Sequence, residues 1–126
     1  MKFFVENSDN VIVTVFAWEA DGQIEASHTE SDIPKEVKSE RIEFTFKKPN
    51  YADSNVIMQS SGLNADGTGG VNFLNFQNTV LRSLLKGWNM KNEDGEKVPF
   101  TNANINNLIP AIARAAVSGV LDKIKM

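Results

Sequence analysis

The sequence predicts an α+β protein in which a small antiparallel β-sheet, from the N-terminal half, packs against about three C-terminal helices. The composition, 41% apolar and 23% charged over 126 residues, is typical of one globular domain. Apolar residues alternate with polar ones in the first half, and they recur at helical spacing in the second half. We therefore expect a single domain over 1–126, with a β-rich part at 1–50 and a helical part at 51–126.

The β-rich part contains two strong strand patterns. Residues 11–18 are rich in β-branched and aromatic side chains. The following Asp21-Gly22 predicts a tight turn that leads into a short returning strand at 23–26. Residues 41–47 alternate strictly between apolar and polar side chains, which predicts a half-buried strand. The polar stretch between these patterns is interpreted as a loop.

A short helix and a glycine-rich loop open the helical part. Asp53 or Ser54 is suited to cap a helix that carries the apolar residues 56–58 and stops at Gly62. Three glycines lie in the eight residues that follow. We therefore expect a mobile, exposed loop over 62–70.

The strongest amphipathic pattern begins after this loop. Eight apolar side chains fall on one half of a helical wheel, which predicts a helix of about 18 residues. They are Phe73, Leu74, Phe76, Val80, Leu81, Leu84, Leu85 and Trp88. We expect this helix to supply most of the core, with Trp88 buried against the last helix rather than exposed.

Two further helices are predicted at the C-terminal end. Thr101 is suited to be the N-cap of the first, and apolar residues then recur at helical spacing. Pro110 interrupts the pattern, so we expect a short helix to about Leu108 and a longer one that restarts at the proline. The small residues of 111–119 predict close packing of the longer helix against another helix.

No residue pattern supports catalysis. The chain has no cysteine, which excludes thiolate chemistry, and its only histidine, His28, lies in a polar stretch without ligand spacing. Residues 92–96 lack the donor pattern of a calcium loop and predict a turn closed by Asp94 and Gly95. The loop at 66–70 lacks the lysine of a phosphate-binding loop. We expect a non-enzymatic protein with no catalytic residue, no cofactor and no metal.

The charge and hydropathy patterns restrict the partners. The net charge of -3 argues against nucleic acid, because proteins that neutralise phosphates usually carry a basic excess. No segment approaches the length of a membrane span, and the apolar run at the N-terminus is too short for a signal peptide. We expect synthesis in the cytosol and neither a nucleic acid nor a membrane as partner.

One order of residue types is specific enough to indicate a family. Between residues 41 and 112 the chain resembles the tail assembly chaperones of tailed bacteriophages and the related baseplate assembly proteins. The resemblance is carried by residues 42–46, Lys48, Pro49, Asn50, Tyr51, Ala52, Asp53, the segment Leu84, Leu85, Lys86, Gly87, Trp88, Asn89, Met90, and then Glu93, Asp94, Gly95, Pro99, Thr101, Asn104, Ile105, Leu108 and Pro110. As the resemblance implies, a strand leads into helices, and a tryptophan turn precedes a threonine-capped helix.

The resemblance implies a small phage protein that binds the tape measure protein or other tail components, such as tail tube or baseplate proteins. It would keep them soluble in the host cell cytoplasm until the tube forms, through a groove of the C-terminal helices that takes an amphipathic helix. The expected partner-binding residues are Trp88, Leu85, Leu81, Ile105 and Ile109.

A second function stays open beside this one. The first 40 residues and the loop at 66–70 do not fit the family pattern. The alternative is therefore a minor structural subunit of the phage tail or baseplate that is retained in the virion. Possible oligomerisation is left open in both cases.

Overall fold

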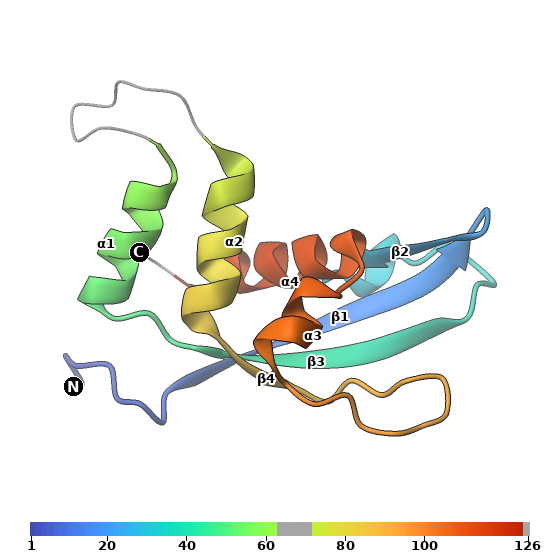
Figure 1. The fold of residues 1–126 in the computed structure, drawn as a ribbon, viewed down its shortest axis with the longest axis horizontal. Helices are drawn as coiled ribbons and strands as arrows, with labels where there is room; N and C mark the ends of the chain where they lie inside the picture. The colour runs from blue at the N-terminus through green and yellow to red at the C-terminus, as the bar shows by residue number, and fades with distance from the viewer. Residues whose placement is uncertain (63–71, 125–126) are drawn as a thin grey trace.

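A four-stranded antiparallel sheet with the strand order β2-β1-β3-β4 forms one layer of the molecule (Figure 1). The computed structural model describes residues 1–62 and 72–124. The strands are β1 (Asn10–Ala20), β2 (Gln23–Ser27), β3 (Ser39–Lys47) and β4 (Leu85–Trp88). The α+β prediction is confirmed, although the fourth strand comes from the C-terminal half of the chain.

The β1–β2 hairpin forms where the sequence predicts it. Asp21 and Gly22 connect the strands with positive φ angles of 53° and 80°, as the mirror-image turns of two-residue hairpins require. Val13 and Val15 are buried on one face of the long central strand β1. On its other face Phe16 and Trp18 are buried but Ile12 is 44% exposed, so only the second half of β1 is covered on both faces. The loop after β2 contains one short 3-10 helix, Glu30–Asp32.

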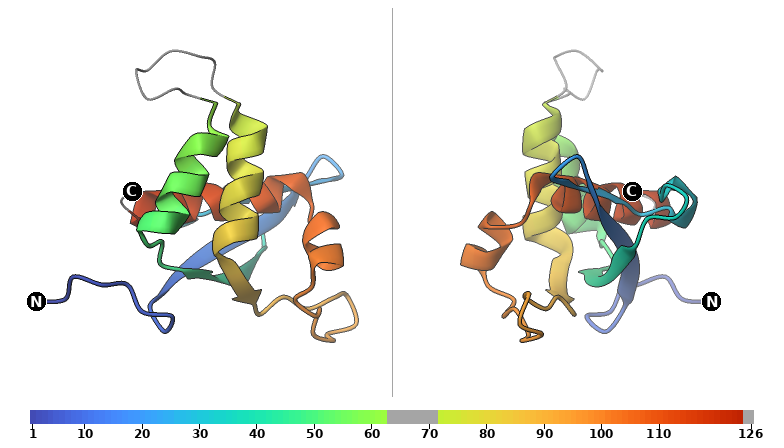
Figure 2. Two further views of the ribbon diagram at one scale, coloured as in Figure 1. Left: turned by 60° about the vertical axis from the view of Figure 1, so that its left-hand side comes forward. Right: turned by 90° about the vertical axis from the view of Figure 1, so that its right-hand side faces the viewer.

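Four α-helices accompany the sheet. Two of them, α1 and α2, lie side by side and project beyond the sheet, whereas α4 runs across β1 and β2 (Figures 1 and 2). The helices are α1 (Tyr51–Ser60), α2 (Phe73–Leu84), α3 (Asn102–Asn106) and α4 (Pro110–Lys123).

The helix caps confirm two predictions and correct one. Thr101 caps α3, since its hydroxyl accepts a hydrogen bond from the Asn104 amide at 3.1 Å, and Pro110 opens α4 as expected. The cap of α1 is Asn50 and not Asp53 or Ser54. Asn50 and Asp53 form a reciprocal capping box, so Asp53 occupies the third helical position instead of the cap.

The predicted 18-residue helix is wrong in its last turn. The α2 helix ends at Leu84, and β4 pairs Leu85 with Phe46 and Trp88 with Phe44 on β3. A register irregularity in this pairing lets both β4 side chains face the core although they are three residues apart. Because a spacing of three also suits a helical stripe, the sequence pattern could not distinguish a helix from this bulged strand.

The core lies between the sheet and the helices. Fully buried side chains come from both layers, among them Val13, Val15, Phe44, Phe46, Ile57, Val80, Leu84, Val117 and Val120. The small residues of α4 were expected to pack against another helix. Gly119 packs against Val13 of β1 and His28 after β2, so the small-residue stretch lets α4 approach the sheet closely; α4 also contacts the helix α2.

Candidate functional site: protein-binding surfaces

Three of the five expected partner-binding residues are parts of the core. Leu81, Leu85 and Ile105 are buried, which leaves them no surface for a partner. Ile109 is 42% exposed at the start of α4. Trp88 is partly buried. The structure therefore does not bring these five side chains together on one accessible groove.

Trp88 connects the sheet to the segment that follows β4. Its indole Nε1 donates a hydrogen bond to the Val98 carbonyl at 2.8 Å. Its ring meets Phe44 and Phe100 edge to face, with ring centroids 6.2 Å and 4.9 Å away. Trp88 thus packs between β3 and Phe100 and is half-buried against the core, so it is neither fully buried nor freely exposed.

Exposed apolar side chains occur instead toward the outer end of both helices of the α1–α2 pair. Phe73 is 70% exposed, Leu74 is 78% exposed and Met58 is 50% exposed. We call these three residues the hairpin tip. The sequence pattern assigned Phe73 and Leu74 to the core, but this first turn of α2 projects beyond the sheet that buries the later turns (Figure 2). Loop residues 63–70, which were expected to be mobile, lie outside the described residues.

Hydrogen bonds join the two helices at this outer end. The Asn72 amide donates to the Ser61 carbonyl at 2.8 Å, and the Asn75 side-chain amide donates to the Ser60 carbonyl at 3.0 Å. Asn72 also caps α2 by accepting a hydrogen bond from the Asn75 amide. The end of α1 and the start of α2 therefore present the exposed apolar residues on a defined backbone.

A second exposed apolar feature is the N-terminal segment. Phe3 and Phe4 are both exposed, and the segment extends away from the sheet (Figure 1). Lys2 holds it near β1 through an ion pair with Asp9, whose carboxylate lies 2.6 Å from the Lys2 ammonium. The Lys2 hydrogen bond, with a further bond from the Glu6 amide, lowers the pKa of Asp9 below its usual value.

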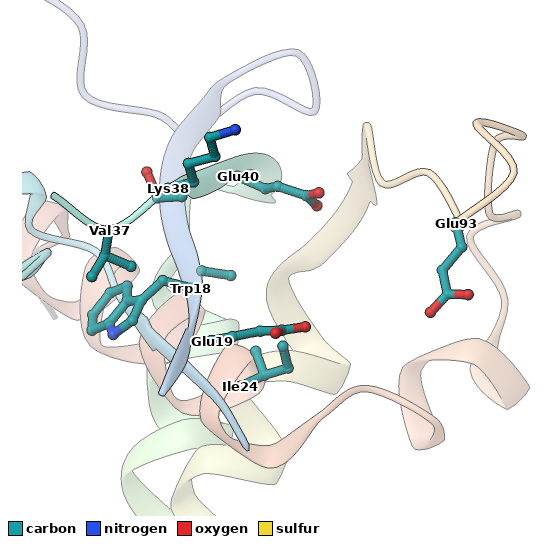
Figure 3. A pocket seen from close by; sticks show the side chains of 9 residues that line it. Trp18, Glu19, Ile24, Val37, Lys38, Glu40 and Glu93 are labelled. Carbon is teal, nitrogen blue, oxygen red and sulfur yellow. The ribbon is translucent and has the colours of Figure 1, made fainter. Parts of the chain in front are cut away.

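An acidic pocket lies at the far end of the sheet. It measures about 630 Å³. Glu19, Ile24 and Glu40 lie on one side of β1 and face Glu93, whereas Trp18 lies on the opposite side of the strand (Figure 3). The described residues contain no group of three or more histidine and acidic side chains placed to hold a metal ion. The pocket thus offers separate carboxylates to solvent without a metal-binding geometry.

His28 has a partner that its sequence position does not reveal. Its Nε2 lies 2.7 Å from the Asp122 carboxylate on α4, and its ring contacts the Gly119 position one turn earlier. The two residues are 94 positions apart, so only the packing of α4 on the sheet brings them together. The pair joins the end of β2 to α4, and in the described part of the chain no serine hydroxyl is hydrogen-bonded to the His28 ring.

Comparisons with known proteins give no further support for a function. No family model, curated protein or solved structure matches the chain. Within residues 1–62 and 72–124, none of the helices combines the length and the apolar content needed to cross a bilayer.

Proposed function

We propose that this protein is a non-enzymatic assembly chaperone of a phage tail, which binds the tape measure protein or another tail component in the host cell cytoplasm. The order of residues in 41–112 supports the family, as set out above. The observation that carries the binding role is the exposure of Phe73 and Leu74 on a capped helix, because large apolar side chains grouped at a surface are typical of interaction sites.

The size of the hairpin tip fits a transient interaction. Burying an exposed Phe, Leu or Met side chain contributes roughly 1.5–3 kcal/mol, before the entropy cost of association is subtracted. Three such side chains therefore support weak to moderate binding. An assembly chaperone needs binding of this strength, because it must release its partner when the tail tube forms.

The partner segment we expect is an amphipathic helix. Its apolar face would lie on Met58, Phe73 and Leu74, in the mode by which helices bind apolar grooves. The surrounding side chains of α1 and α2 are mostly neutral amides and hydroxyls. Recognition at this surface would therefore depend on apolar contact and would change little with ionic strength.

The test is co-expression of the tagged protein with the tape measure protein or another tail protein from the same phage. We expect the double variant Phe73→Ser and Leu74→Ser to lose most of the captured tail protein while its melting temperature stays within a few degrees of the wild type. Val37→Ser is the matched control, because it also removes a partly exposed apolar side chain but lies in the loop before β3, outside the expected partner-binding residues. Equal capture by the double variant and the wild type would refute the binding role of the hairpin tip.

The second candidate is a minor structural subunit of the tail or baseplate. The exposed Phe3 and Phe4 on an extended N-terminal segment favour it, since neighbouring subunits in a particle would bury them. Mass spectrometry of purified particles separates the two functions. A chaperone should be absent or present in traces, and a fixed number of several copies per particle would establish the structural subunit instead.

A further inference from the structure

The outer edge of β2 is open. β2 is the first strand in the sheet order and pairs only with β1, so alternate residues of Gln23–Ser27 direct their backbone N–H and C=O groups away from the sheet. No backbone hydrogen bond from the described residues outside the sheet reaches this strand. The edge can therefore pair with another extended chain.

A groove runs between this edge and α4. Its volume is about 400 Å³, and it is lined by residues 25–28 on one side and by Ala111, Arg114, Ala115 and Ser118 on the other. Residues 25–27 belong to β2, and successive side chains of a strand point to opposite faces, so three consecutive strand residues can line one groove only if it follows the edge of the strand. The small side chains on α4 leave space for the side chains of an added strand.

The charged side chains that line the groove favour an acidic occupant. Arg114 is exposed, and its guanidinium has neither a hydrogen bond nor an ion pair within the described part of the chain. His28, which shares this groove, is already paired with Asp122. Glu25 points to the opposite face of the sheet, because its neighbour Ala26 faces α4 together with Ala17. The α4 side of the groove therefore presents one cation without a partner.

We propose that an extended acidic segment of a partner protein adds to β2 as a further strand and places a carboxylate against Arg114. Backbone hydrogen bonds to the β2 edge would supply affinity, and the Arg114–carboxylate pair would supply specificity and register. This inference does not rest on the proposed function, because the groove and the hairpin tip are separate surfaces.

The experiment uses two synthetic peptides of about nine residues, the length of a long strand, made of alternating threonine and valine. One carries glutamate at its centre and the other lysine. Binding to the ¹⁵N-labelled full chain is followed by NMR, with amide hydrogen exchange read at residues 23–27. We expect the glutamate peptide to bind about 10-fold more tightly and to slow exchange along β2, since a charge-assisted pair contributes on this order.

Charge reversal tests the role of Arg114 directly. Arg114→Glu should reverse the preference between the two peptides, while Lys35→Glu, an equal charge change in the loop after β2, should leave it unchanged. The hairpin-tip double variant should bind the glutamate peptide normally, which separates a failure here from a failure of the chaperone function. Equal binding of both peptides, no binding up to about 1 mM, unprotected β2 amides, or self-association through β2 without peptide would each overturn the proposal.

Discussion

Gly119 of α4 lies directly against Val13 of β1. A Cβ atom placed on Gly119 would be 2.4 Å from Val13 Cγ1 and 3.0 Å from His28 Cβ. Non-bonded carbon atoms pack at about 3.5–4.0 Å, so even a methyl group at this position requires the helix or the strand to move. The distance between α4 and the sheet thus depends on the absence of a side chain at Gly119.

We expect Gly119→Ala to lower the free energy of unfolding by about 1–3 kcal/mol through overpacking, although alanine favours helix by about 1 kcal/mol. Urea denaturation measures the change. Gly87→Ala is the control, because no atom lies within 4 Å of the corresponding Cβ and its φ is not positive. A Gly119→Ala variant as stable as the wild type would contradict the close packing of α4.

Trp88 should act on stability more than on binding. Trp88→Phe removes the hydrogen bond to Val98 and should cost about 1 kcal/mol, whereas Trp88→Ala also removes the contacts with Phe44 and Phe100 and should cost about 2–4 kcal/mol. Thermal melts, combined with the capture assay for tail proteins, check both effects. Lost capture at unchanged stability would instead establish Trp88 as the partner-facing residue.

Two leucines on the same helix should respond in opposite ways to the same change. Leu81 is buried and Leu74 is 78% exposed. Leu81→Asp places a charge without a partner in the core, so the variant should unfold or aggregate. Leu74→Asp should melt cooperatively near the wild-type temperature. Circular dichroism and size-exclusion chromatography distinguish the two, and a cooperatively melting Leu81→Asp variant would contradict the core described above.

The Lys2–Asp9 ion pair predicts a local pH effect. Because Lys2 lowers the folded-state pKa of Asp9, the contribution of the pair to stability is present above the ordinary pKa of 3.8 and is lost as pH falls through the lowered value. We expect Lys2→Ala to raise the pKa of Asp9 toward its ordinary value in an NMR titration. Lys35→Ala is the control, and an unchanged Asp9 titration in Lys2→Ala would show that the pair does not persist in solution.

Local patterns predicted much of the fold correctly. The Asp21-Gly22 turn, the alternating strand now seen as β3, the Thr101 cap and the restart of the helix at Pro110 all depend on interactions within a few residues, so the sequence contains the information needed. The turn closed by Asp94 and Gly95 is of the same kind, since the Asn92 side chain accepts the amide hydrogen bonds that hold it.

The candidate surfaces were predicted less well. The amphipathic pattern that begins at Phe73 correctly marks a helix with an apolar face. It does not predict that the first turn of α2 extends beyond the sheet and is exposed. Its first residues are therefore exposed at the hairpin tip, and Leu81, which was expected to bind a partner, is core. The β2–α4 groove was missed because Arg114 and Ala26 are far apart in sequence.

The sequence by itself determined the α+β class, the hairpin turn and the positions at which helices α3 and α4 begin. Each of these follows from side chains that act on their own backbone within one turn of the chain. The tertiary structure alone decided that Leu85–Trp88 forms a strand, since β4 exists only where its backbone pairs with the edge of β3. It also decided the His28–Asp122 pair, because that contact depends on the distance at which Gly119 lets α4 pack on β1.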